Sequence, residues 1–445
     1  MIVGGVNGDD LQGGPGDDVF LVSGSDQGID FVSGGDGFDQ ILGGAGDDTI
    51  GVWEYFGVDT VERIDGGAGV NVLTGSIYGD TLDFSGTTLL NIARIEGGTG
   101  DDRITGSAGN DVIVGGADGD ILSGGAGNDT YEVSTGDTVT EAASAGTDTV
   151  VSDITWTLGS NLENLFLTGT GAINATGNAD ANLVRGNAAD NTLTGAAGVD
   201  ALEGGAGNDT LSDSAGTDNG YFNGGAGADT LTGDSGREFF LGGVGNDTIN
   251  AGSSADIIAF NKGDGQDTVS ASTGQDKVLS LGGNLNYSDL AFRAVGSDLV
   301  LDTGASESLT FKSWYTGTTN KSMLTLQVIA EAMAGFNPTG GNALLDNKVE
   351  SFNFQGLVNA FDSARAANPG LSSWALTSGL AQFQLSGSDT AALGGDLAYQ
   401  YGLNGTLAGV GFNKAQDVLT GTGFGTQAQT LRPLATLQDG FVPLS

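Results

Sequence analysis

Aspartate residues recur at a fixed spacing in this chain, and glycines precede each of them. The stretch GGTGDDRITGSAGNDVIVGGADGDILSGGAGNDTYE, from Gly97 to Glu132, contains nine-residue units of the form G-G-x-G-x-D-x-U-x, where U is large and apolar. Carboxylate and backbone carbonyl oxygens are hard ligands, and Ca²⁺ takes six to eight of them at about 2.3–2.6 Å. The chain has no His and no Cys, the ligands that recruit softer transition metals. The residue types and their spacing therefore predict calcium binding.

A short strand and a tight turn must position each carboxylate, because the unit is only nine residues long. The apolar residue has to point inward, since burying a Leu or Ile contributes about 1.5–3 kcal/mol. A single unit cannot bury its own apolar face, so successive units must stack. Stacked strands lie about 4.7–4.9 Å apart, and aspartates in that register repel one another unless a cation lies between them. We predict stacked turns held together by cations.

The composition narrows the classes of partner. The 445 residues include 81 Gly, 56 Asp and Glu and only 14 Lys and Arg, for a formal net charge of −42. Such a chain is repelled by nucleic acids and by anionic membranes. No run of about 18 apolar residues predicts a membrane-spanning helix. We therefore expect calcium as a partner, no nucleic acid and no membrane insertion.

The tandem repeat resembles the RTX family, the nonapeptide repeats of hemolysin-type calcium-binding proteins. The resemblance covers Gly4 to Val269, with gaps. It implies a mainly β fold: a right-handed parallel β-roll, or β-helix solenoid, in which two nonapeptides make one turn. It also implies that several Ca²⁺ ions lie between units n and n+2. A small mixed α/β C-terminal region is expected to follow.

Carried onto this sequence, the n and n+2 rule gives a set of carboxylate pairs. It pairs Asp102 with Asp120, Asp111 with Asp129, Asp18 with Asp39, Asp30 with Asp48, and Asp229 with Asp247. Asp209 and Asp200 are paired with Asn191 and Asn182, and we expect those sites to be weaker or empty because Asn lowers the ligand charge. Glu238 opposite Asp256 is a further departure. For the isolated copy at Gly66, which has Asn71 at the aspartate position, we favour a purely structural turn.

The resemblance implies that glycines of the same turns contribute to the metal sites. The predicted metal-site residues are Gly13, Gly16, Asp18, Asp30, Gly34, Gly37, Asp39, Gly43, Gly46, Asp48, Gly97, Gly100, Asp102, Gly106, Gly109, Asp111, Gly115, Asp120, Gly124, Gly127, Asp129, Asp200, Gly204, Gly207, Asp209, Gly224, Gly227, Asp229, Gly242, Gly245, Asp247 and Asp256.

Changes in the repeat pattern predict how the chain is organised. The expected segments are a β-roll block at 1–51, a degenerate stretch at 52–96 that continues the solenoid, a second block at 97–132, an irregular β connection at 133–176, a third block at 177–276, a β-rich cap at 277–321 and a helical region with a secretion signal at 322–445.

Beyond about residue 277 the pattern is different. Segments 290–302 and 307–315 predict antiparallel strands joined by a Gly-Ser turn. Apolar residues spaced by three and four predict helices over 323–336, 354–370 and 374–385. The last segment, 431–445, contains two prolines and is predicted to be coil.

Two functions fit the sequence. One is a structural or adhesive protein of a bacterial cell surface, biofilm matrix or S-layer, which folds on extracellular calcium and self-associates or contacts matrix components. The alternative is the secretion and calcium-folding module of a larger RTX enzyme or toxin. In both, the resemblance implies export by a type I secretion machinery. The repeats begin within four residues of Met1, so we expect a segment of a longer chain. Without His or Cys, a Ser-His-Asp triad, a Cys-His pair and a zinc helix are excluded, and we predict no enzyme.

Overall fold

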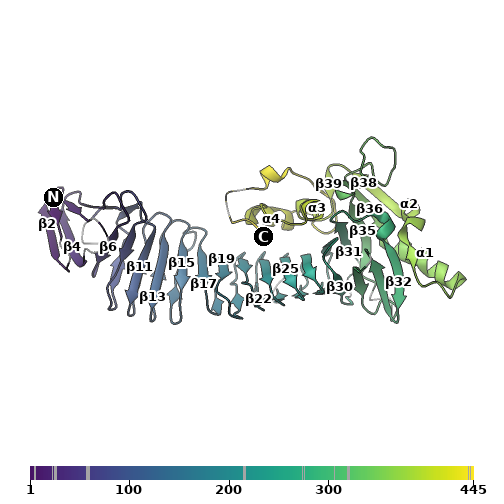
Figure 1. Cartoon of the computed structure of the whole chain (residues 1–445), viewed down its shortest axis with the longest axis horizontal. Helices are drawn as coiled ribbons and strands as arrows, with labels where there is room; N and C mark the ends of the chain where they lie inside the picture. Colours follow the sequence, from purple (N-terminus) through teal and green to yellow (C-terminus); the bar gives the residue numbers. More distant parts are fainter. Residues whose placement is uncertain are drawn as a thin grey trace. The chain divides into compact units, whose positions relative to one another are not determined.

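The computed structural model describes residues 1–4, 7–22, 24, 28–56, 61–213, 217–272, 274, 276–304, 306–317, 321–438, 440 and 442–445. The repeat copies that start at Gly4 and Gly24, and the insertion after Gly51, lie partly outside these residues. Two compact units follow one another along the chain, Met1–Gly171 and Ala172–Ser445. Each consists largely of short stacked strands (Figure 1).

The first unit is a parallel β-solenoid. Most of its strands pair in parallel with a strand one turn further along, so the strands form stacked sheets. One row is β1-β3-β5-β7-β10, another is β9-β12-β14-β16, and the longest runs from β2 and β4 through even-numbered strands to β8, then through odd-numbered strands from β11 to β19. The strands are β1 Ile2–Val3, β2 Asp10–Pro15, β3 Val19–Leu21, β4 Ile29–Asp36, β5 Gln40–Leu42, β6 Thr49–Val52, β7 Arg63–Asp65, β8 Val72–Thr74, β9 Thr81–Asp83, β10 Thr88–Leu90, β11 Arg94–Thr99, β12 Arg103–Thr105, β13 Val112–Ala117, β14 Ile121–Ser123, β15 Thr130–Val133, β16 Thr138–Val139, β17 Thr149–Ser152, β18 Trp156–Thr157 and β19 Asn164–Leu167.

The apolar eighth residue of each repeat forms the core of this unit. Ile95, Ile113 and Tyr131 lie opposite one another in successive turns and are buried. The stack continues past the last perfect repeat, because Val150 and Leu165 follow Tyr131 in the same register. The stretch after residue 132 therefore continues the solenoid, and its apolar residues alternate as those of half-buried strands do.

The second unit begins with the same kind of architecture and ends in a mixed region. Its parallel strands are β20 Ala175–Thr176, β21 Leu183–Arg185, β22 Thr192–Thr194, β23 Ala201–Ala206, β24 Thr210–Ser212, β25 Tyr221–Gly227, β26 Thr230–Thr232, β27 Phe239–Gly245, β28 Thr248–Asn250, β29 Ile257–Asn261, β30 Gln266–Val269 and β31 Lys277–Gly282. Odd-numbered strands from β21 to β31 form one sheet and even-numbered strands from β20 to β30 the other. Phe222 and Phe240 stack with ring centroids 5.0 Å apart, which adds to the energy of burial.

Antiparallel strands end both sheets of the second unit. β34 Ser308–Phe311 pairs with β33 Asp298–Asp302, which pairs with β32 Ala291–Val295, so the hairpin predicted there is confirmed. On the other sheet β35 Met323–Ile329 pairs with β36 Val349–Asn353 and then β38 Gln384–Ser388. The short strands β37 Trp374–Ala375, β39 Ala391–Ala392 and β40 Gln429–Thr430 complete the set.

Of the predicted helices, the segment at 354–370 is confirmed as α1 Phe354–Ala367, which begins with the Asn353 side chain accepting a hydrogen bond from Gly356 N at 2.8 Å. The helix predicted at 323–336 is wrong. That segment forms β35 and a 3₁₀ turn, η2 Ala330–Ala332, because it lies between β31 and β36 and pairs with both. The helix predicted at 374–385 is reduced to η3 Leu376–Ser378 and α2 Leu380–Phe383 between two strands.

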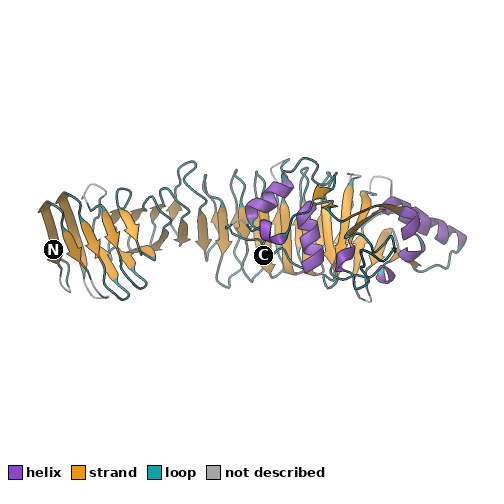
Figure 2. Ribbon diagram, turned by 90° about the horizontal axis from the view of Figure 1, so that it is seen from above, coloured by secondary structure: helices purple, strands orange, loops and turns teal. Residues whose placement is uncertain are grey.

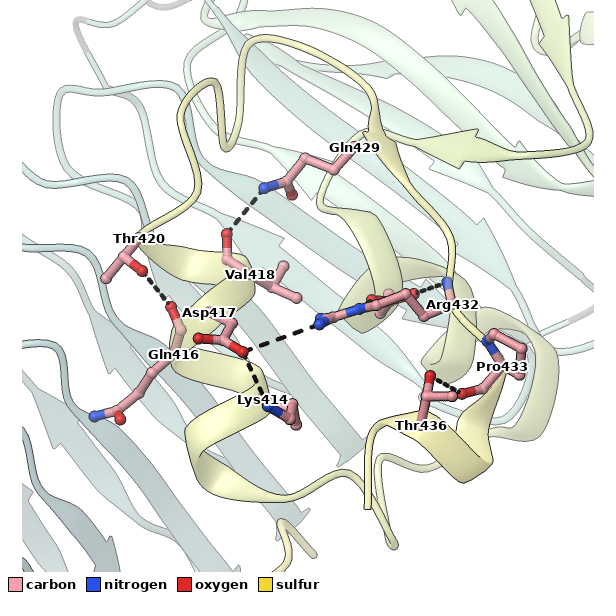
Figure 3. A network of polar contacts seen from close by, with 10 residues as sticks. Lys414, Gln416, Asp417, Val418, Thr420, Gln429, Arg432, Pro433 and Thr436 are labelled. Carbon is pink, nitrogen blue, oxygen red and sulfur yellow. Dashed lines mark hydrogen bonds and ion pairs between the residues drawn. The ribbon is translucent and has the colours of Figure 1, made fainter. Parts of the chain in front are cut away.

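The helices α3 Gly395–Asn404 and α4 Phe412–Leu419 pack together along the repeats of the second unit (Figure 2). No helix in the described part of the chain has the length and apolar character needed to cross a membrane. After α4, Gln429 Nε2 donates to Val418 O at 3.0 Å, and Arg432 lies 4.0 Å from Asp417 (Figure 3). The segment predicted as coil contains one 3₁₀ turn, η4 Leu434–Thr436.

The C-terminal segment also contacts the repeats of its own unit. Ser445 N donates to Glu203 Oε1 at 2.6 Å, and Arg185 donates to Pro443 O at 2.9 Å. Further along, Arg237 donates to Phe424 O at 3.0 Å. These contacts attach the last residues to the sheet that contains β21, β23 and β25.

Candidate metal centres

The sixth residues of the repeats lie one above another and form ladders of acidic side chains. In each ladder the backbone N–H of one residue donates to the side-chain oxygen of the residue one turn later, at distances of 2.7–3.0 Å. The first ladder is Asp80, Asp102, Asp120 and Asp137; the second is Asp111, Asp129, Asp148 and Glu163; the third is Asn191, Asp209, Asp229, Asp247 and Asp267.

This geometry leaves one oxygen of most of these carboxylates without a hydrogen bond, whereas Asp111 Oδ2 accepts from Ser107 N at 2.7 Å. Within the described residues, the buried Oδ2 atoms of seven ladder aspartates have no partner. A buried polar atom without a partner costs about 1–3 kcal/mol, and more when it is charged. The stacked repeats are therefore incomplete without a positive group beside these oxygens. The seven are Asp102, Asp120, Asp129, Asp148, Asp209, Asp229 and Asp247.

Glycine at the first position keeps this space open for oxygen atoms. A Cβ atom added to Gly224 would meet Asp229 Oδ2 and the carbonyl oxygen of Gly242, each at 2.5 Å. The same two kinds of oxygen surround Gly97 and Gly204. We call the space beside the first glycine of a repeat a cradle. Each cradle thus brings together a carboxylate oxygen of its own turn and a backbone carbonyl oxygen of the next turn.

The donor set fits calcium. All the donors are oxygens, and within the described ranges no three or more His, Cys, Asp or Glu side chains gather around one point. Backbone carbonyls must therefore supply several of the six to eight ligands that Ca²⁺ requires. Gly100 and Gly207, predicted at the fourth position, have positive φ of 105° and 113°, a conformation open to glycine, and this shapes the turn.

Burial changes the protonation of the ladders. Desolvation, together with a smaller effect of neighbouring carboxylates, raises the pKa of Asp102 and Asp129 to about 7, against the ordinary 3.8. It raises the pKa of Asp247 to about 7 and that of Asp209 to about 6. Without a cation, then, protons neutralise the ladders at mildly acidic pH, and a metal ion must compete with them.

Most of the predicted pairs are brought together. Asp18 N donates to Asp39 Oδ1 at 2.6 Å, and Glu238 N donates to Asp256 Oδ1 at 3.1 Å. The other stacked pairs are Asp102 with Asp120, Asp111 with Asp129, Asp229 with Asp247, Asn182 with Asp200, and Asn191 with Asp209.

Asp30 and Asp48 are not brought together. Asp30 Oδ1 accepts from Asp9 N at 2.9 Å, and Asp48 N donates to Asn71 Oδ1 at 3.0 Å. The register of β4 with β6 sets Asp30 opposite Val52, because the repeat copy from Gly24 is longer than nine residues. The copy at Gly66 therefore takes part in the stack through Asn71.

The repeat template missed five ladder residues that lie in imperfect copies. Four of them begin an Asp-Thr-aliphatic triplet, which places the carboxylate before a strand and the apolar residue inside it. That triplet would have found them, whereas the search for paired glycines did not. The missed residues are Asp80, Asp137, Asp148, Asp267 and, without the triplet, Glu163.

Comparison with a family model agrees with the presence of calcium-binding repeats. A family model described as the RTX calcium-binding nonapeptide repeat (4 copies) matches residues 24–51, 96–131, 176–211, 214–249 and 232–266. No curated protein matches the chain. Among solved structures, the extracellular lipase LipA from Serratia marcescens is similar at 18% identity and a TM-score of 0.21. That match covers 55% of this chain and 42% of the lipase, so this chain spans less than half of the lipase.

Proposed function

Because the chain carries RTX calcium-binding nonapeptide repeats, we propose that it is a secreted structural protein whose rolls fold when they bind extracellular calcium. The observation that carries this proposal is the row of buried Oδ2 atoms, which have no partner in the described residues. A ligand that binds only the folded state stabilises it, by about 2.7 kcal/mol for each site at a hundred times its dissociation constant.

The residues proposed to hold calcium are the sixth-position carboxylates and the glycine carbonyls of the same turns. In the first ladder these are Asp102 and Asp120 with Gly97 and Gly115 beside them. Calcium would supply the positive charge that the buried carboxylates lack and would link one turn to the next. The aspartates hold the ion and also orient the next turn through their Oδ1 atoms.

The proposed location and role follow from this dependence of folding on calcium. A chain with a net charge of −42 repels itself when calcium is scarce and stays extended, which suits export in an unfolded state by a type I secretion machinery. Outside the cell, calcium would fold it into a stiff solenoid. We propose a role at the cell surface or in a matrix, where stiffness and self-association are useful, in preference to a folding module of a larger enzyme or toxin.

A calcium titration followed by far-UV circular dichroism tests the proposal. We expect a cooperative gain of β signal between chelator and about 10 mM calcium, with magnesium ineffective because it requires a strict octahedron of ligands. A chain that is equally folded in chelator and in calcium would contradict the proposal. Light scattering in the same titration tests the matrix role: growth of large species supports it, and a persistent monomer contradicts it.

A further inference from the structure

One ladder of the second unit ends in a lysine. The register Phe239 to Ile257 to Val278 places the preceding residues Glu238, Asp256 and Lys277 one above another on the same sheet. Lys277 therefore takes the place in which the third ladder has its last aspartate, Asp267. A basic residue thus follows two acidic ones in a stack that is otherwise built from acidic or neutral side chains.

The ammonium group of Lys277 is bound by the oxygens of the preceding turn. Nζ donates to Ala251 O at 3.1 Å and to Ser254 O at 2.8 Å, and it forms an ion pair with Asp256 Oδ2. Ala251, Ser254 and Asp256 are the first, fourth and sixth residues of one nonapeptide. The side chains of Lys277 and Asp256 are both fully buried.

This donor set is the one that the calcium cradles offer: a sixth-position carboxylate and backbone carbonyls. In the third ladder Asp229 Oδ2 and Asp247 Oδ2 have no partner among the described residues, whereas Asp256 Oδ2 has the lysine. The first position also differs, because Ala251 replaces the glycine found at Gly224 and Gly242. A methyl group therefore stands where those repeats keep space for oxygen atoms.

We propose that the ammonium group of Lys277 is the resident cation of this turn and takes the place of a calcium ion there. This inference rests on the proposed function, since it assumes that the other ladders take calcium. The charge of Asp256 is thus neutralised by a lysine of the same chain. Strands β29 and β31, which enclose this turn, should stay folded when calcium is removed and so offer a fixed end on which calcium-dependent turns stack.

The first test needs no substitution. Hydrogen exchange of the full chain in chelator should show protected amides in β29 and β31 and rapid exchange in β12, β14, β24 and β26. Adding calcium should then protect all six strands. Equal and rapid exchange of β29 and β31 in chelator would overturn the inference.

The second test replaces the resident cation. Lys277→Asp, made together with Ala251→Gly, recreates the arrangement of Asp247 and Asp267, and we expect this double variant to bind one calcium ion more than the parent when bound calcium is counted by equilibrium dialysis. Lys277→Met removes the charge without adding a ligand, so it should gain no ion and lose the protection of β29 and β31 in chelator. Lys312→Met, at an exposed ion pair with Asp298, is the matched control and should behave like the parent.

The outcomes separate the two proposals. If the parent binds no calcium at all, the proposed function fails. If the parent binds calcium but Lys277→Met keeps β29 and β31 protected in chelator, the lysine is not the resident cation. Should the double variant fail to fold in calcium, the exchange pattern of the parent and of Lys277→Met still decides.

Discussion

Seven of the ladder aspartates have two separate tasks, one for each carboxylate oxygen. In Asp120, Oδ1 accepts the backbone N–H of Asp102, and Oδ2 is buried without a partner among the described residues. The first task fixes the stacking of one turn on the next and needs only an acceptor. The second needs a cation. Asparagine can perform the first task and not the second, which makes the two experimentally separable.

Asp102→Asn should raise the calcium concentration at the folding midpoint by about tenfold or more, equivalent to about 1.4 kcal/mol. The amide keeps an acceptor for Asp80 N and removes the charged oxygen from the cradle. Asp101→Asn is the matched control, because the side chain of Asp101 is exposed and the substitution changes the net charge by the same amount. Equal shifts of the midpoint in the two variants would show that overall charge, not the cradle, governs calcium binding.

At the scale of the element, the nonapeptide combines a strand with a turn whose first glycine lies against the oxygens of the candidate metal site. A Cβ at Gly106 would meet Gly124 O and Asp111 Oδ2. At Gly109, three residues later in the same repeat, it would meet only Ser107 Oγ at 3.5 Å, and φ is not positive there. Oxygen atoms therefore exclude a side chain at Gly106, whereas Gly109 has space for one.

Gly106→Ala should weaken calcium-dependent folding several-fold, because the methyl group displaces oxygens from the cradle. Gly109→Ala should change the stability of the calcium-bound protein by less than about 0.5 kcal/mol. Thermal unfolding in saturating calcium and the calcium midpoint both measure this difference. The explanation of the cradle would be wrong if both variants lost calcium affinity equally.

The ladders also predict how folding depends on pH. Burial raises the pKa of Asp102 and Asp129 to about 7 from 3.8, so protonation stabilises the metal-free ladders. That stability is fully present below about pH 4 and is lost as the pH rises through about 7. With calcium-free protein, circular dichroism should show more β structure at pH 5 than at pH 8. In calcium the order should reverse at limiting ion concentration, because protons compete for the carboxylates. A metal-free spectrum that does not change between pH 5 and pH 8 would contradict the raised pKa values.

At the scale of the whole molecule, each of the two units contains ladders of its own. In stacked repeats the stability is close to a sum of local terms and contacts between neighbouring turns. We therefore expect two thermal transitions at limiting calcium. Asp102→Asn should lower one of them and Asp229→Asn the other, as calorimetry can measure. A single transition that both substitutions shift equally would show that the units unfold together.

The sequence predicts most of the ladders because the repeat encodes them locally. Within one nonapeptide, Asp102 marks the turn and Ile104, two residues later, marks the core. What the sequence does not reveal depends on register between distant strands. The segment Met323–Ile329 has apolar residues that fit a helix or a strand, and pairing with β31 and β36 decides. Lys277 likewise lies outside any repeat motif, and only its position next to Asp256 indicates that it acts as the cation of that turn.

The attachment of the C-terminal segment has a mechanical consequence. A pull applied at Ser445 would first load its contact with Glu203 and then the Pro443 contact with Arg185. Glu203 and Arg185 belong to β23 and β21, the first two strands of one sheet in the second unit, and they are joined by their own ion pair. Tension at the chain end would thus enter the roll from its side, across strands held by many backbone hydrogen bonds, before it could peel the antiparallel strands from the end of the sheet.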